Sequence, residues 1–167
     1  MDLRSLQRPL KKSYREDASQ ARITLTAKGE QTEAGPISCS IDIGRAIYEA
    51  QAHEGVGGAG TGACSGDLLL GALAACKQIT IQMVATAMEL PVTDVRVTVE
   101  GDLDLRGTLG IDRETPVGFS EIRTDVKIEG SLTAEQLQSL QEKSEQYCVV
   151  LQTLQNKPPM SIKWQQT

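Results

Sequence analysis

Aromatic residues and histidine are scarce in this sequence, and positive charge is not in excess. Aromatic residues make up 3 % of the 167 residues, and His53 is the single histidine. A protein that stacks nucleic-acid bases on aromatic rings normally carries more of them. The 17 basic and 22 acidic side chains give a net charge of −5, whereas a binder of phosphate backbones is usually basic. We therefore expect no nucleic-acid partner.

Long apolar runs and a leader segment are also missing. The longest stretch without a charged or strongly polar residue, 68–76, has nine residues, whereas a membrane-spanning helix needs about 20. Residues 1–12 are charged and show neither an apolar segment nor a small-residue cleavage site, so we expect no signal peptide and no membrane partner. We predict a cytoplasmic protein with a polar N-terminal arm, residues 1–20, and one domain, residues 21–167.

The four cysteines do not have the spacing of a metal site. Cys39, Cys64, Cys76 and Cys148 include no C-x-x-C pair, and a single histidine adds little to them, which argues against structural zinc. Structural disulfides are rare in the reducing cytoplasm. We expect free thiols and no structural zinc.

Hydrophobic periodicity predicts an α+β fold. The predicted elements, in chain order, are strands at 22–28 and 37–51, a helix at 65–89, strands at 95–105 and 122–129, a helix at 133–157 and a strand at 160–166. Strands joined as hairpins imply antiparallel sheets, with two long central helices in the order β-β-α-β-β-α-β. The connection 106–119 is long for a hairpin, so we expect an extended β-arm or a loop that contacts a partner.

Both predicted helices carry terminal signals and an apolar stripe. Ser65 is the predicted N-cap of the first helix, and Thr133 with Gln136 has the spacing of a capping box for the second. The inner stripes are expected to include Leu69, Leu73, Cys76 and Met83 in the first helix, and Leu137, Leu140, Cys148, Leu151 and Leu154 in the second. The first helix is apolar on more faces than a small sheet can cover, which predicts an obligate homodimer.

A glycine-rich loop precedes the first helix and offers one candidate site. Gly55, Gly57 and Gly60 match the pattern G-x-G-x-x-G between a strand and a helix, which is typical of dinucleotide binding. No acidic residue follows at about twenty positions, and hairpin-paired strands do not suit a dinucleotide-binding sheet. Dinucleotide binding by this loop stays an alternative, beside a closely packed entry loop.

The two helical cysteines offer the sharper candidate. Cys76 and Cys148 lie on the predicted inner faces of two helices that we expect to pack together. They are either inert core residues or a peroxide-reactive thiol and the thiol that resolves its sulfenic acid. Because a buried thiol is poorly ionised, a reactive Cys76 needs a positive partner. A non-enzymatic homodimer that binds a small molecule in an apolar crevice is the alternative of another class.

Two segments resemble the OsmC/Ohr family of osmotically inducible and organic-hydroperoxide-resistance proteins. Residues 65–76, SGDLLLGALAAC, are similar to the segment that ends in the first family cysteine, and residues 147–150, YCVV, to the one around the second. The resemblance implies an interlocked homodimer with active sites at its interface. It also implies cofactor-free, thiol-dependent reduction of organic hydroperoxides, and of hydrogen peroxide, with Cys76 and Cys148 as the catalytic pair. Dithiols, often lipoyl groups on proteins, would regenerate the enzyme.

The chain departs from the family pattern at several positions. At the position where the family has a glutamate, this chain has Gly66, followed by Asp67. After the second cysteine it has Val149 in place of the family's proline. No arginine lies near the first hairpin turn, so we predict that Arg45 is the activating cation, anchored by Asp67. Cys64 is an extra thiol that could resolve Cys76 in place of Cys148.

Overall fold

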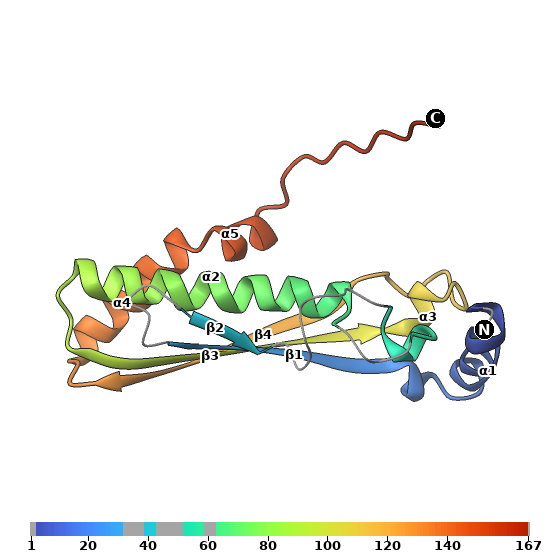
Figure 1. Ribbon diagram of the computed structural model, residues 1–167, viewed down its shortest axis with the longest axis horizontal. Helices are drawn as coiled ribbons and strands as arrows, with labels where there is room; N and C mark the ends of the chain where they lie inside the picture. Colours follow the sequence, from blue (N-terminus) through green and yellow to red (C-terminus); the bar gives the residue numbers. More distant parts are fainter. Residues whose placement is uncertain (1–2, 32–38, 43–51, 59–62, 167) are drawn as a thin grey trace.

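The computed structural model describes residues 3–31, 39–42, 52–58 and 63–166. The helices are α1 (Leu3–Glu16), η1 (Ala18–Ala21), η2 (Glu54–Val56), α2 (Ser65–Ala87), α3 (Leu105–Thr108), α4 (Ala134–Tyr147) and α5 (Val149–Gln155). The strands are β1 (Arg22–Gln31), β2 (Cys39–Asp42), β3 (Val92–Asp104) and β4 (Phe119–Gly130). Figure 1 shows the long strands below α2, with α1 at one end of the molecule.

The strands form one antiparallel sheet in the order β2-β1-β3-β4, which confirms the predicted α+β class. Strand alternation explains its two faces. Val95, Val97 and Val99 of β3 are buried under α2. Arg96 and Glu100, which alternate with them, pair with charged residues of β4 on the opposite face. One covered face and one charged face are typical of antiparallel sheets.

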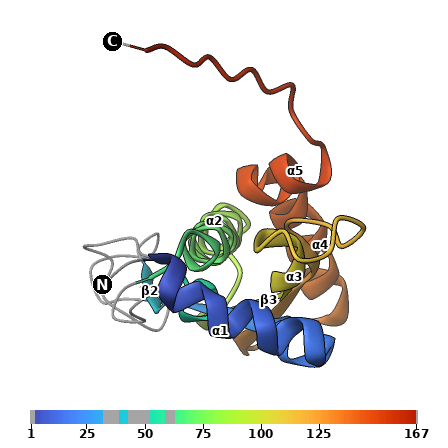
Figure 2. The same cartoon turned by 90° about the vertical axis from the view of Figure 1, so that its right-hand side faces the viewer.

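Helix α2 lies lengthwise along the covered face, and α4 lies beside it (Figures 1 and 2). By length and composition α2 could cross a membrane, which the nine-residue apolar run did not indicate. However, 56 % of its most apolar window is buried inside the fold, and Lys77, Gln78 and Gln82 are among the buried side chains. These properties are those of a core helix.

The N-cap of α2 is Cys64 and not the predicted Ser65. Asp67, at the third helical position, accepts a hydrogen bond from the backbone N–H of Cys64 at 2.8 Å. The carboxylate thereby satisfies a donor at the helix end, where negative charge is also favoured by the helix dipole. A polar residue at 65 was therefore a misleading signal, because the carboxylate two places later sets the boundary.

The predicted inner stripe of α2 is wrong at most positions. Leu69 and Met83 are 39 % and 51 % exposed, and Cys76 is half-buried, although Leu73 is buried as expected. The buried face consists mainly of Leu70, Leu73, Ala74, Lys77, Gln78 and Ile81. Because the helix is apolar on nearly all sides, its composition did not identify the inner face. Among the inward polar groups, Gln78 Nε2 donates to the carbonyl of Val95 at 2.7 Å, and Lys77 pairs with Glu145.

The second long helix is broken in two at Cys148. Its predicted capping box is confirmed, because Thr133 Oγ1 accepts from the N–H of Gln136 and Gln136 Oε1 accepts from the N–H of Thr133. At Cys148 the backbone turns extended, with φ −74° and ψ 100°, and this residue both ends α4 and caps α5. The apolar period continues across the break, so the sequence pattern concealed it.

The C-terminal strand predicted at 160–166 is absent from the described sheet. Residues 157–166 have no regular structure and extend away from the body (Figure 1). Met160, Ile162 and Trp164 are 72 %, 73 % and 93 % exposed. Their alternation gave the strand prediction, but within the described chain no neighbouring strand pairs with them.

Three segments at the chain ends and connections can be compared with the expectations. The N-terminal segment forms α1, whose Tyr14 O–H donates to the carbonyl of Gly55 at 2.6 Å. The connection after β3 holds the short helix α3, capped by Asp104, and is not a β-arm. Of the strand predicted at 37–51, the described part is β2; residues 37–38 and 43–51 lie outside the described residues.

Candidate functional site

The fold brings the two helical thiols together. Cys76 lies in the middle of α2, and Cys148 lies at the break between α4 and α5. The two side chains lie close enough for Cys76 to act on the pKa of Cys148, and both thiols are free. The predicted juxtaposition of Cys76 and Cys148 is therefore present in the structure, although Cys76 reaches it from a half-exposed face of its helix.

Cys148 is fully buried, and its surroundings act on the thiol in opposite directions. Burial, the largest effect, raises the pKa of Cys148, and the hydrogen bond with Cys76 raises it further. The N–H of Leu151, in the first turn of α5, donates to the Cys148 sulfur and lowers this pKa. The ammonium of Lys77 also lowers it. The net result is a raised pKa, so the buried thiol is mainly protonated at neutral pH.

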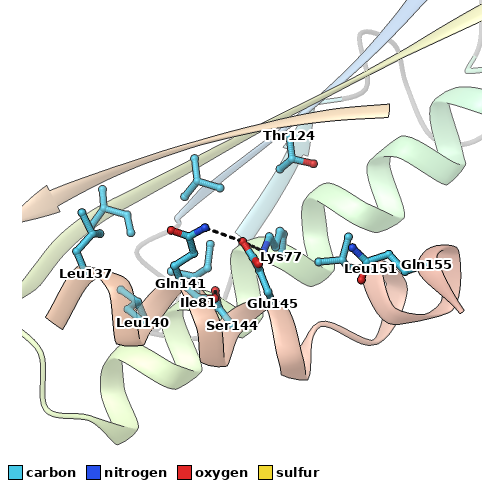
Figure 3. Close-up of a pocket in the computed structure, with 12 residues that line it drawn as sticks. Lys77, Ile81, Thr124, Leu137, Leu140, Gln141, Ser144, Glu145, Leu151 and Gln155 are labelled. Carbon is cyan, nitrogen blue, oxygen red and sulfur yellow. Dashed lines mark hydrogen bonds and ion pairs between the residues drawn. The ribbon is translucent and has the colours of Figure 1, made fainter. Parts of the chain in front are cut away.

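An ion pair with a buried cation lies next to the thiols. The side chain of Lys77 is 7 % exposed, and its Nζ lies 3.8 Å from Glu145 Oε1. The same carboxylate oxygen accepts a hydrogen bond from Gln141 Nε2 at 3.1 Å. Figure 3 shows Gln141, Glu145 and Lys77 converging between α4 and α2. Glu145 precedes Cys148 by three residues, and its own carbonyl accepts from Gln152 Nε2 of α5 at 3.1 Å, which ties the two helices across the break.

A cavity of about 500 Å³ opens beside this ion pair. Its walls come from α2, α4, α5 and β4 and are largely apolar. The lining residues are Lys77, Ile81, Thr124, Val126, Ile128, Leu137, Leu140, Gln141, Ser144, Glu145, Leu151 and Gln155. Neither cysteine lines the cavity, but Lys77 follows Cys76 in the chain and Leu151 donates its N–H to Cys148. The cavity therefore adjoins the thiol pair through these two residues.

The other predicted site residues do not join the pair in the described structure. Cys64 is separated from Cys76 by three helical turns, about 18 Å along the axis, and burial raises the pKa of its thiol. Asp67 is engaged in the cap of α2. Arg45 lies outside the described residues, so its role as the activating cation stays a prediction.

Sequence reasoning missed Lys77 and Glu145. A lysine in the middle of an otherwise apolar helix was a usable signal, because a buried lysine needs a partner. Its partner was not recognisable, since Glu145 belongs to a polar helix with several acidic residues. Among the acidic residues of α4, Glu145 becomes the partner of Lys77 only because α4 packs on α2 in this register.

The glycine-rich loop has a packing role in the described structure. A Cβ at Gly55 would collide with the side chain of Leu105, and Gly57 has a φ of 95°, which favours glycine. His53 Nδ1 accepts from the N–H of Gly55 at 2.9 Å and thus caps η2. Gly60 lies outside the described residues. The sheet is antiparallel, whereas the dinucleotide-binding fold requires parallel strands joined by helices, so the dinucleotide alternative loses its structural basis.

Comparison with known proteins gives one family and one fold. A family model described as "OsmC-like protein" matches residues 58–163. The structure of an OsmC-like hydroperoxide resistance protein from Jannaschia sp. CCS1 superimposes with a TM-score of 0.58 at 15 % sequence identity, covering 84 % of this chain and 91 % of that chain. No curated protein matches the sequence. The structural likeness concerns the fold, and the family match includes both paired cysteines.

Proposed function

The chain belongs to the OsmC-like protein family, and from its paired thiols we propose that it is a thiol-dependent peroxidase that reduces organic hydroperoxides. The observation that carries this proposal is that two free thiols, Cys76 of α2 and Cys148 at the break between α4 and α5, lie close enough to influence one another. Two thiols in contact can become one disulfide with little movement of the backbone. The structural neighbour, a hydroperoxide resistance protein, supports the same class of chemistry.

The proposed reaction has two steps within the protein. The Cys76 thiolate attacks the terminal peroxide oxygen, an S–O bond forms, the O–O bond breaks, and the alkoxide leaves and is protonated to an alcohol. Cys76 is now a sulfenic acid. The Cys148 thiolate then attacks the Cys76 sulfur, the S–S bond forms, and hydroxide leaves and is protonated to water. Cys76 is the attacking residue because its side chain is only partly buried, whereas Cys148 is fully buried.

A homodimer and an external dithiol complete the proposal. The outer face of α2 exposes Leu69 and Met83 on either side of the half-buried Cys76, and a second copy would cover this apolar stripe. A small dithiol, such as a lipoyl group, would return two electrons and two protons to the Cys76–Cys148 disulfide in the cytoplasm. Apolar neighbours of the pair favour an alkyl hydroperoxide over hydrogen peroxide as substrate.

Intact mass spectrometry after one equivalent of tert-butyl hydroperoxide tests the proposal. The wild-type chain should lose about two mass units as the disulfide forms, and peptide mapping should join Cys76 to Cys148. Cys76→Ser should consume no peroxide, because an alcohol has no accessible anion at neutral pH. Cys148→Ser should stop at the sulfenic acid with one equivalent, and a further excess of hydroperoxide should drive it to sulfinic acid, about 32 mass units heavier than the thiol. Unchanged wild-type mass would refute the peroxidase proposal, and a Cys64–Cys76 bond would move the resolving role to Cys64.

The cavity beside the ion pair favours a second candidate function. A space of about 500 Å³ with mostly apolar walls has the size and character of a small-molecule site. In this alternative the protein binds an apolar ligand without catalysis, and the two cysteines are unreactive wall neighbours. Counting free thiols before and after the peroxide addition separates the two functions, because ligand binding leaves the count unchanged.

A further inference from the structure

Lys77 is a buried cation that the proposed reaction has not yet used. Its side chain lies in an apolar surrounding and is held by Glu145, which is 47 % exposed and itself fixed by Gln141. A buried ion pair is poor support for stability, because the desolvation of its charges offsets their attraction. The pair nevertheless occupies the position next to the only two thiols that the described structure brings into contact.

The step that needs a cation here is the attack by Cys148. Thiol–disulfide chemistry proceeds through the thiolate, and burial of Cys148 works against that form. Among the described residues, the titratable groups that face Cys148 are Cys76 and Lys77 from α2, with Glu145 of α4 reaching it through Lys77. The cavity wall from β4 adds Thr124, Val126 and Ile128, which carry no charge. Of the residues that the structure describes, Lys77 is thus the positive group that acts on Cys148.

We propose that Lys77, clamped by Glu145, is the positioning residue that stabilises the Cys148 thiolate during its attack on oxidised Cys76. This inference rests on the proposed peroxidase function and assigns the cation to the resolving thiol instead of the attacking one. The atoms and charges of the Cys148 attack balance as in the proposed reaction. The proton that leaves Cys148 ends on the hydroxide released from Cys76, which departs as water, while the Lys77 ammonium keeps its protons and compensates the charge on sulfur.

The first test measures the Cys148 thiolate directly and needs no peroxide. In a chain whose Cys39, Cys64 and Cys76 are serine, absorbance near 240 nm, after subtraction of the tyrosinate contribution measured at 295 nm, follows Cys148 as the pH is raised. Lys77→Met should move the midpoint upward by about one pH unit, the usual effect of losing a neighbouring opposite charge. Lys143→Met is the matched control, because Lys143 is an exposed lysine of α4, and its midpoint should equal that of the parent. Superimposable titrations of the Lys77→Met and parent chains would overturn the proposal.

The second test measures disulfide formation between Cys76 and Cys148 across pH, with Cys39 and Cys64 replaced by serine. Lys77→Met should form the disulfide about tenfold more slowly at pH 7, with a difference that shrinks at high pH where the thiolate forms without help. Lys77→Arg, which retains a cation, should recover most of the rate. A slowdown that is equal at all pH values, or an arginine variant as slow as the methionine variant, would show a packing role and overturn the proposal.

The oxidant distinguishes failure of this inference from failure of the proposed function. Disulfide formation is driven by tert-butyl hydroperoxide in one series and by oxidised glutathione in the other. If the wild-type chain reacts with glutathione disulfide but not with the hydroperoxide, the peroxidase function fails. The glutathione series and the absorbance titration then still decide whether Lys77 controls Cys148.

Discussion

At the scale of single residues, Gly101 of β3 is packed closely by Phe119 of β4 and Leu70 of α2. A Cβ built there would lie 2.5 Å from the ring of Phe119 and 3.2 Å from Leu70 Cδ2. We expect Gly101→Ala to destabilise the protein by about 1–3 kcal/mol, because overpacking forces its neighbours to shift. Chemical denaturation measures the loss, and a second substitution, Phe119→Leu, should recover part of it. An alanine variant as stable as the parent would show that the ring moves freely.

The residues of the candidate site were predictable only in part. Cys76 and Cys148 could be paired from sequence, because each marks a helix that the fold packs together. Lys77 could not be assigned a role, since its effect depends on a distance between two helices. Asp67 was predicted to anchor Arg45. The structure shows its carboxylate in the helix cap, and Arg45 lies outside the described residues, so that contact stays a prediction.

At the scale of elements, the break between α4 and α5 offers a sharp test of local geometry. Val149 is the first residue of α5, a position that favours proline, and Cys148 before it already has the extended backbone that proline requires. We expect Val149→Pro to leave stability unchanged or raise it by about 0.4–1 kcal/mol, because proline reduces the entropy of the unfolded chain. Thermal or chemical unfolding measures the change.

Leu151→Pro is the control for this prediction, because proline has no backbone N–H to donate to the Cys148 sulfur. It should destabilise the protein and raise the pKa of Cys148. Loss of stability in both variants would mean that the break is maintained by contacts of the Val149 side chain.

Element types were predictable where two independent signals agreed. The capping box at Thr133 and the apolar period gave α4, and valine alternation gave β3. The break at Cys148 carried no signal, because the chain has valine at 149 where a proline would have marked it. The strand at 160–166 was predicted from its alternating apolar and polar residues. A strand also needs a second strand to pair with, and the sequence pattern does not show whether one is within reach.

At the scale of the whole molecule, we predict that the C-terminal segment pairs with a second copy. Met160, Ile162 and Trp164 alternate and are exposed, and β4 is an edge of the described sheet. An extended chain of this pattern suits addition to the sheet edge of a partner. Light scattering should give a dimer for the full chain at micromolar concentration, and truncation after Asn156 should weaken it at least tenfold.

Substitution of serine for the three apolar tail residues is the control, because it preserves the length of the chain. It should weaken the dimer as truncation does. A monomeric full-length protein, or a truncated chain that associates as tightly as the parent, would contradict the role of the tail.

The position of the two thiols in the chain gives oxidation a mechanical consequence. Cys76 and Cys148 are 72 positions apart, so a bond between them would tie nearly half of the polypeptide into a closed ring. The unfolded ring has far fewer arrangements than the open chain, which should add about 4 kcal/mol to the free energy of unfolding. The oxidised protein should melt about 10 °C above the reduced protein, and Cys148→Ser should show no such difference. The melting temperature would then report whether the Cys76–Cys148 disulfide has formed.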